Sequence, residues 1–233
     1  MTDKATYYLT PNATGTAFTG SGYTPDGTLP SGVIPCTQAQ AQNFQAYVPS
    51  NGEIVGAPDS VLLPQAQTAQ KALITQGYNT STDYVPVTIN GTTYQVDNTA
   101  GKQALNLSLA ITANGILNAS AWAASTEYTA GAYCNVGGVI LFCSASGKSG
   151  TSAPTPPTTF GTPVTDGTAE WELMGRKVYL QGGSFVWMTP QQIMSAFQQG
   201  EMYLHQMSNQ LESLIAQINA AQTSGAVAAI VWP

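Results

Sequence analysis

The strongest constraint on the fold is a run of mainly apolar residues near the C-terminus, spaced alternately four and three residues apart. The run continues without a break over four heptads and comprises Ile193, Phe197, Gly200, Leu204, Met207, Leu211, Leu214, Ile218 and Ala221. This spacing predicts one long helix with a single buried seam. A capping box of Thr189 and Gln192, with Pro190 at the first helical position, starts the helix. Gly225 can end it, and Gly200 is its weak point.

The sequence leaves the partner of this seam open. The seam can pack within the chain on a second helix expected over residues 100–117, or it can associate with the same seam in two further copies. The e and g positions lack the opposite charges that would specify a partner helix. We therefore expect packing within the chain or against another protein, with a trimer favoured if the chain forms a homo-oligomer.

Turn chemistry predicts three β-hairpins. The clearest spans Tyr84–Asp97, where Asn90-Gly91 supplies the positive φ values of a type I′ turn. The strand residues that share its apolar face are Val85, Val87, Ile89, Tyr94 and Val96. A second hairpin is expected over Cys134–Cys143, around a Gly-Gly turn, and a third over Val178–Trp187.

The second hairpin brings two cysteines near each other. In its register Val136 faces Val139 and Cys134 faces Leu141. Cys143 then lies diagonally from Cys134 on the same face, at roughly 7–8 Å. That separation exceeds the distance of about 4.4–6.8 Å between the Cα atoms of a disulfide. We therefore expect free thiols.

The remaining segments complete an α+β fold with a loop-rich N-terminal part. Residues 1–64 predict an irregular attachment region, because their first half is rich in Gly, Thr and Pro. Within it, Thr37 and Gln40 form a capping box that predicts a short helix over 38–47, where Phe44 and Tyr47 share one face. Residues 65–118 and 176–233 form a hairpin–helix core, and residues 119–175 are inserted into it.

Two further helices are expected in the hairpin–helix core. One covers residues 65–79 and ends at Gly77. The other covers residues 100–117, and Gly115 can end or kink it. On this second helix Leu105, Leu109 and Ile116 share one side, with Leu107 and Ile111 nearby.

The inserted residues 119–175 predict a small aromatic β-module, in which short strands and a Gly/Ser/Pro loop carry Trp122, Tyr128, Tyr133 and Trp171. The segment resembles the small carbohydrate-binding modules appended to chitinases, and the resemblance makes these four residues candidates for glycan binding. Aromatic rings match the apolar faces of pyranose rings. The same rings can instead form the core of a module that is too small to fold without them. Both can hold, with Trp122 buried and Tyr128 exposed.

Residues 84–233 resemble an uncharacterised C-terminal domain of phage tail-fibre and tail-fibre-assembly proteins. The shared order is Ile89-Asn-Gly91-Thr-Thr-Tyr94-Gln-Val-Asp97, a helix, Phe185-Val-Trp187-Met-Thr189, a long capped helix and a terminal Trp232-Pro233. Residues 33–64, with Ile-Pro, a short helix and Asn-Gly-x-Ile-Val, resemble the N-terminal part of phage fibre-assembly and fibre-tip proteins. The family has no catalytic residues that could be assigned to this chain.

The resemblance implies a structural virion protein of a bacteriophage tail, at the baseplate or at a tail-fibre attachment point or tip. Its partners would be other phage tail proteins and a host-surface glycan, and it would enter the virion after synthesis in the host cytoplasm. Two alternatives remain: a tail-fibre assembly chaperone, and an accessory carbohydrate-binding subunit of a secreted polysaccharide hydrolase.

Composition and motifs argue against several other functions. Only 8 % of residues are charged, and the scattered basic residues are outnumbered by acidic ones, so we expect no nucleic-acid partner. No run approaches the roughly 18 apolar residues of a membrane span, and the N-terminus has no apolar signal region. We also expect no enzyme, metal or cofactor, because no nucleophile–base pair, metal-ligand set or carboxylate pair is visible. The lone His205 is interpreted as structural, and Gly147–Gly150 lacks the spacing of a phosphate loop.

Overall fold

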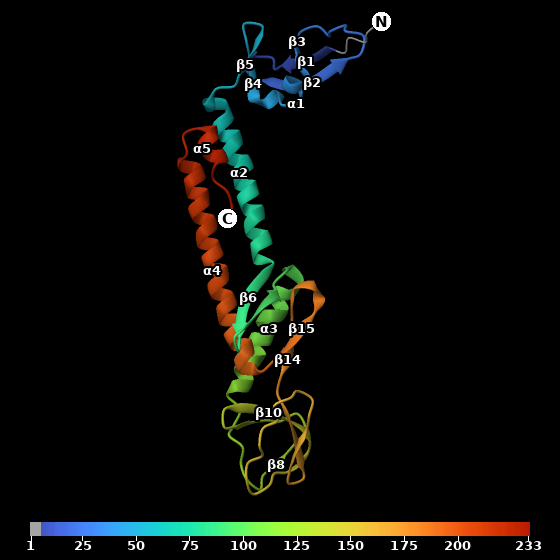
Figure 1. Ribbon diagram of the computed structural model, residues 1–233, viewed down its shortest axis with the longest axis vertical. Coiled ribbons are helices and arrows are strands. Elements are labelled where there is room, and N and C mark those ends of the chain that lie inside the picture. Colours follow the sequence, from blue (N-terminus) through green and yellow to red (C-terminus); the bar gives the residue numbers. More distant parts are fainter. Residues whose placement is uncertain (1–5) are drawn as a thin grey trace. The chain divides into compact units, whose positions relative to one another are not determined.

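The computed structural model describes residues 6–233, which form an α+β fold of helices and small antiparallel sheets (Figure 1). The chain divides into two compact units. The first consists of the chain up to Ile74 together with Ser213–Pro233, and the second is Thr75–Glu212. These limits differ from those expected at residues 64, 118 and 175. The two long helices, α2 (Asp59–Thr82) and α4 (Pro190–Ala220), contribute residues to both units.

The first unit contains an antiparallel sheet, so the irregular conformation expected for residues 1–64 is wrong for the described part, and residues 1–5 lie outside it. β1 (Thr6–Pro11) lies between β2 (Phe18–Thr24) and β3 (Ile34–Cys36). Leu9 is fully buried and packs with Phe18. A glycine of β2 explains the error: a Cβ at Gly22 would overlap the ring of its cross-strand partner Tyr8. This glycine makes room for a ring and does not mark a loop.

The capping box of Thr37 and Gln40 is present. The Gln40 N–H donates to Thr37 Oγ1, and the Thr37 N–H donates to Gln40 Oε1. The helix that it starts, α1, is shorter than the expected 38–47. The elements that follow the cap are α1 (Gln38–Gln42), the 3₁₀ turn η1 (Phe44–Ala46), and the hairpin of β4 (Tyr47–Ser50) and β5 (Glu53–Gly56).

Helix α2 is longer at both ends than the expected 65–79. It continues through Pro64, which has no N–H to bond the carbonyl one turn earlier, and through Gly77. Tertiary contacts in the first unit compensate, because Gln67 Nε2 donates to the carbonyl of Ile218 at 3.0 Å. Asp59 Oδ1 also accepts from Ser224 Oγ, at the start of α5 (Ser224–Ala228), at 2.8 Å.

The second unit is built on the predicted hairpin of β6 (Tyr84–Ile89) and β7 (Thr92–Asp97). Asn90 and Gly91 have φ values of 50° and 79°, as a type I′ turn requires. The register pairs Val85 with Val96 and Val87 with Tyr94, so the expected apolar face is confirmed. The buried residues that pack on it from other elements are Ala113, Val178, Met188, Ile193 and Ala196.

Helix α3 (Ala100–Leu117) has the predicted limits and runs through Gly115, but its buried face differs from the expected one. Ile116 is buried and Leu109 packs against the core, both as expected, but the other buried residues of the helix are Ala110 and Ala113. Leu105 lies one turn before Leu109 on the same side but is exposed, as are Leu107 and Ile111. Small alanine side chains let a helix lie close to a sheet. Hydrophobic periodicity did not predict this buried face, because it gives more weight to the larger leucines.

Helix α4 begins with the predicted capping box. The Thr189 N–H donates to Gln192 Oε1, and the Gln192 N–H donates to Thr189 Oγ1. The helix continues through Gly200 and ends at Ala220, so Gly225, which lies in α5, does not end it. The seam is confirmed at its two ends, where Ile193 and Ile218 are buried. The seam residues between them are only half-buried: Phe197, Leu204, Met207, Leu211 and Leu214.

The β-module, residues 119–175, belongs to the second unit. Its main sheet has the order β12-β13-β10-β9. The strands are β8 (Glu127–Tyr128), β9 (Tyr133–Val136), β10 (Val139–Ala145), β11 (Gly147–Lys148), β12 (Val164–Asp166) and β13 (Ala169–Leu173). Cys134 faces Leu141 as expected, and both cysteines of this hairpin are free thiols. The third predicted hairpin follows, as β14 (Arg176–Tyr179), the turn η2 (Gln181–Gly183) and β15 (Phe185–Met188).

Candidate functional site

Two tryptophans of the β-module converge on one buried carboxylate. Asp166 is 5 % exposed. Its Oδ2 accepts hydrogen bonds from Trp122 Nε1 at 2.7 Å and from Trp171 Nε1 at 3.1 Å. Its Oδ1 accepts from the Gly150 N–H at 2.7 Å. Asp166, on β12, therefore ties β13 to the two loop segments that carry Trp122 and Gly150.

These contacts correct the interpretation of Trp171 as a glycan ligand. Its exposed fraction is 0 %, so no sugar can stack on it. Tyr128 packs edge-on against Trp171, with ring centroids 4.8 Å apart. Its hydroxyl oxygen accepts from the Ala123 N–H at 2.8 Å, and Trp122 packs on the same cluster. Three of the four candidate rings thus serve the core of the module.

The fourth candidate, Tyr133, lies in a different environment. Its ring is tilted against Phe142, with centroids 5.8 Å apart. Both rings line a groove of about 240 Å³ between the β-module and the hairpin β14–β15. We call it the aromatic groove; the lining side chains that matter here are Tyr133, Phe142, Phe160, Glu172, Arg176 and Trp187.

The aromatic groove contains a stacked ring pair, of which Trp187 is exposed and Phe160 is half-buried. Phe160 and Trp187 stack with centroids 5.6 Å apart and an interplanar angle of 23°. A Cβ at Gly175 would overlap the Phe160 ring, so the glycine lets that ring lie where it does. Within residues 6–233, the side chains of Glu172 and Arg176 form no hydrogen bond or ion pair. Both charged groups are therefore available to a ligand.

The groove residues Phe160 and Trp187 were not among the sequence candidates. Trp187 marks the end of a predicted hairpin, and Phe160 stands alone in the Gly/Ser/Pro loop. The signal that could have identified Trp187 is its strand position, because Val186 and Met188 alternate with it and face inward.

Comparison with protein-family models, with curated proteins and with solved structures finds no significant match for this chain.

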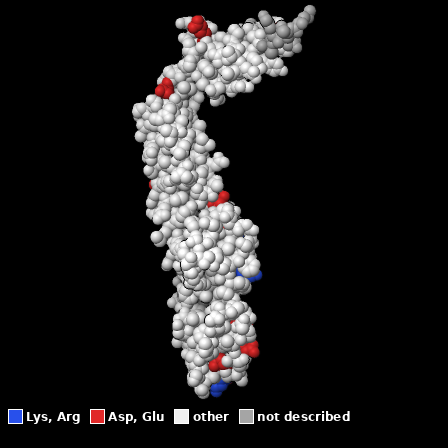
Figure 2. All heavy atoms as spheres, in the orientation of Figure 1, with Lys and Arg blue, Asp and Glu red and all other residues white. Residues whose placement is uncertain are grey.

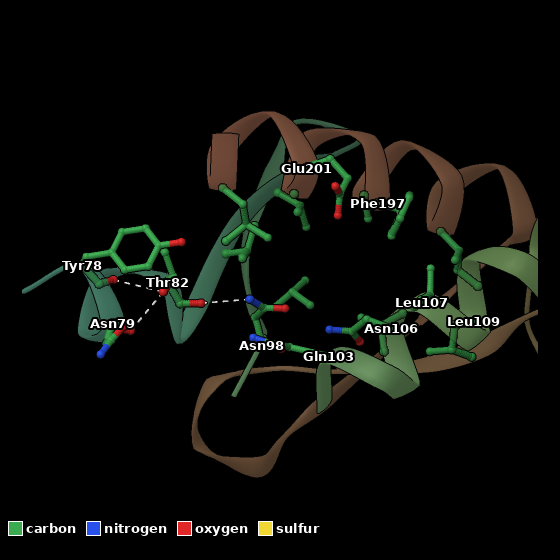
Figure 3. A pocket seen from close by; sticks show the side chains of 18 residues that line it. Tyr78, Asn79, Thr82, Asn98, Gln103, Asn106, Leu107, Leu109, Phe197 and Glu201 are labelled. Carbon is green, nitrogen blue, oxygen red and sulfur yellow. Dashed lines mark hydrogen bonds between the residues drawn. The ribbon is translucent and has the colours of Figure 1, made fainter. Parts of the chain in front are cut away.

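A larger pocket, of about 610 Å³, opens along α4 in the second unit. We call it the seam pocket. Figure 3 shows Phe197 and Glu201 of α4 on one side, facing Asn106, Leu107 and Leu109 of α3. The seam residues that line it are Ile193, Phe197, Gly200 and Leu204. Asn98, at its rim, donates from Nδ2 to the Thr82 carbonyl at 3.0 Å. The N-terminal half of the predicted seam is therefore incompletely covered by the described chain.

Charged side chains are few around the seam pocket, whereas Glu172 and Arg176 line the aromatic groove. The face drawn in Figure 2 shows only isolated charged side chains on a neutral surface. Two lysines lie over aromatic rings, Lys102 over Tyr179 at 4.0 Å and Lys177 over Phe185 at 4.2 Å.

Among residues 6–233 there is no group of three or more His, Cys, Asp or Glu side chains placed to hold a metal ion. No helix in that range is both long and apolar enough to cross a bilayer.

Burial raises the pKa of both thiols of the β-module, Cys134 and Cys143. It raises the pKa of Cys134 from 9.0 to about 12, with smaller contributions from the charges of Asp166 and Cys143. Burial also raises the pKa of Cys143, partly offset by a backbone hydrogen bond at Ala145. Both groups stay protonated at neutral pH, and a protonated buried thiol is a poor nucleophile.

Proposed function

We propose that this chain is a structural protein of a bacteriophage tail, at the baseplate or at a tail-fibre attachment point or tip, and that it contacts host-surface glycans. The order of features in residues 84–233 supports the first part, because it resembles the C-terminal domain of tail-fibre and tail-fibre-assembly proteins. The aromatic groove supports the second part, and the exposed Trp187 ring stacked on Phe160 is the observation that carries it.

The exposed ring of Trp187 suits the apolar face of a sugar. Trp187 is 43 % exposed although it is one of the largest apolar side chains in the second unit. Its stacking on Phe160 fixes the plane of the indole before any ligand arrives. A ring held in this way gives contact area at a low cost in conformational entropy. The flat face of a pyranose is the kind of ligand that such a ring stacks against.

The charged residues of the groove suit sugar hydroxyl groups. Glu172 supplies acceptors and Arg176 supplies donors, and a hydroxyl group can both donate and accept. Because the two charges have opposite signs, a neutral sugar is favoured over an acidic one. The groove volume of about 240 Å³ is below the roughly 300–1,000 Å³ of sites for drug-sized ligands. The groove therefore suits a single ring of a polysaccharide.

Calorimetric titration of the full chain with chitotetraose, cellotetraose and maltotetraose tests this proposal. We expect at least one of these neutral oligosaccharides to bind, with a change in tryptophan fluorescence. Trp187→Ala should weaken that binding by roughly tenfold or more, the equivalent of about 1.4 kcal/mol.

Phe185→Ala is the matched control for Trp187→Ala. Phe185 lies on the same strand and has a similar exposed fraction, 46 %, but it does not line the groove. Its replacement should leave sugar affinity unchanged. Equal losses in the two variants, or no binding of any of the three sugars at millimolar concentration, would contradict the glycan part of the proposal.

The virion part needs a separate measurement. Mass spectrometry of purified phage particles should detect the chain at a stoichiometry comparable with other tail proteins. A chain that is abundant in infected cells but absent from particles would instead be a fibre-assembly chaperone. This outcome does not depend on whether the aromatic groove binds sugar.

A further inference from the structure

The seam pocket has the size and the lining of a small-molecule site. All of its lining residues belong to the second unit. The apolar face of the hairpin β6–β7 contributes Val85, Val87 and Val96, and helices α3 and α4 flank them (Figure 3). The volume of about 610 Å³ falls within the roughly 300–1,000 Å³ of sites for drug-sized ligands. A small apolar molecule can therefore bury most of its surface there.

Asn98 offers this pocket a buried hydrogen-bond acceptor. The residue lines the pocket and is 8 % exposed. Its Nδ2 donates to the Thr82 carbonyl at 3.0 Å, and because a carbonyl can only accept, this bond identifies which amide atom is the nitrogen (Figure 3). Within residues 6–233 no group donates to Asn98 Oδ1. A buried acceptor without a donor costs free energy, and a ligand that donates removes that cost.

Two further lining residues repeat this arrangement. Asn106 Nδ2 donates to the Asp97 carbonyl at 2.9 Å, and no group of the described chain donates to its Oδ1. The Thr82 hydroxyl donates to the carbonyls of Tyr78 and Asn79, at 3.0 and 3.1 Å. Asn98, Asn106 and Thr82 thus direct hydrogens to backbone carbonyls and keep oxygens for a ligand.

The charges around the pocket are negative. Glu201 is the charged residue that lines it, and its side chain points into it (Figure 3). Among the described residues Glu201 has no ion-pair partner. The C-terminal end of α2 lies at the same pocket, because Tyr78 and Thr82 also line it. A helix C-terminus carries a partial negative charge, and α2 has no basic residue in its last turn. A cation is therefore favoured at this end of the pocket.

We propose that the seam pocket binds a small amphipathic molecule that carries a protonated amine. Its apolar part packs against the valines of β6 and β7, and its ammonium group supplies the counter-charge that Glu201 lacks. An ammonium group has only donors, which suits a lining of acceptors, and a carboxylate has only acceptors. The aromatic groove shares no lining residue with this pocket, so the amine site and the sugar site are independent.

NMR titration of the full chain with octylamine, octan-1-ol and octanoate tests the proposal. The three probes share one alkyl chain and differ in the head group. Octylamine should shift the amide signals of β6 and β7 and bind roughly tenfold more tightly than octanol, the equivalent of one hydrogen bond to a charged group. Octanoate should bind more weakly than either. Equal affinities for the three probes, a preference for octanoate, or no binding at millimolar concentration would overturn the proposal.

Glu201→Gln separates the charge from the apolar cavity. The side chain is exposed, so the variant should fold, and it should remove the advantage of octylamine over octanol. Glu212→Gln is the matched control, because Glu212 is an exposed glutamate of the same helix that does not line the pocket. It should bind octylamine as the wild type does. Equal losses in the two variants would show that net charge, and not this pocket, attracts the amine.

Gly200→Leu tests the location of the site. Gly200 lines the pocket, and a Cβ there meets only Val85 Cγ1, at 3.5 Å, so the larger side chain extends into the cavity. The variant should weaken octylamine and octanol alike, and a circular dichroism melt should show that it is folded. A folded Gly200→Leu variant that binds octylamine with wild-type affinity would place the amine elsewhere and overturn the proposal.

Discussion

Asp166 is the residue on which the core of the β-module depends. Its carboxylate accepts from two indole N–H groups and one backbone N–H. Asp166→Ala would leave these donors without a partner, so it should lower the free energy of unfolding by about 2–5 kcal/mol. Urea unfolding followed by tryptophan fluorescence measures this loss.

Asp26→Ala is the comparison for that variant. Asp26 is exposed and accepts only from the Thr28 N–H, at 3.0 Å. Its replacement should change stability by no more than about 0.5 kcal/mol. Similar losses at residues 26 and 166 would mean that the indole contacts do not stabilise the module.

The Cys134 thiol gives the molecule a dependence on alkaline pH. An unfolded thiol ionises near 9.0, but burial raises the pKa of Cys134 to about 12 in the folded chain. Between these values the unfolded state loses its proton first. Stability from this group is therefore complete below pH 9.0 and falls as the pH rises toward 12.

The measurement is urea unfolding at a series of pH values, in the wild type and in Cys134→Ala. The difference between the two proteins isolates this thiol from the tyrosines and lysines that also titrate there. That difference should shrink as the pH rises above 9.0. A difference that stays constant would show that the thiol ionises as easily when folded as when unfolded.

The sequence identified part of the candidate site but did not show which way its aromatic rings point. The sequence correctly marks Trp122, Tyr128 and Trp171 as members of one module. It cannot tell that their rings turn inward, because the buried Asp166 that holds the indoles is up to 44 residues away in the chain. The outward direction of Trp187 is likewise not visible from residue type. It follows from the alternation of β15, because the neighbouring residues on that strand face the core.

At the scale of elements, the sequence correctly predicted the features that depend on residues close together in the chain. The Asn-Gly hairpin, the Gly-Gly hairpin register and both capping boxes depend on residues within a few positions of one another. The limits of α2 and the sheet β1–β3 do not. Pro64 and Gly77 are tolerated inside α2, and Gly22 is required by a ring on the neighbouring strand. Such compensation becomes visible only when distant residues are brought together.

Helix α4 is expected to be least tolerant at its buried ends. Ile218 is fully buried in the first unit, so Ile218→Ala should destabilise the chain by about 2–5 kcal/mol. Gln217 is its exposed neighbour, and Gln217→Ala should change stability by less than about 0.5 kcal/mol. Thermal melts by circular dichroism compare the two, and matching losses would contradict the position of the seam.

Gly200 offers the opposite effect in the same helix. It lies in the helix interior without a positive φ, and an added Cβ would make an ordinary contact with Val85. Gly200→Ala should therefore stabilise the chain by about 0.4–1 kcal/mol, because alanine loses less conformational entropy in a helix. A lower melting temperature would show that the helix needs glycine there.

At the scale of the whole molecule, the two units differ in how the chain builds them. Thr75–Glu212 is continuous and contains its own hydrophobic clusters. A fragment of these residues should fold alone, and its NMR spectrum should reproduce the amide shifts of the hairpin β6–β7 from the full chain. Narrow dispersion of the amide shifts, typical of an unfolded chain, would show that the second unit needs residues of the first.

The lack of basic residues in α4 has a consequence for digestion. No Lys or Arg follows Lys177, so a protease that cleaves after basic side chains finds no site from Val178 to the C-terminus. The longest helix resists such enzymes through its composition, whether it is folded or not. A tryptic digest would release β15, α4 and α5 on one long peptide, and chymotrypsin, which cleaves after large apolar residues, would be needed to resolve them.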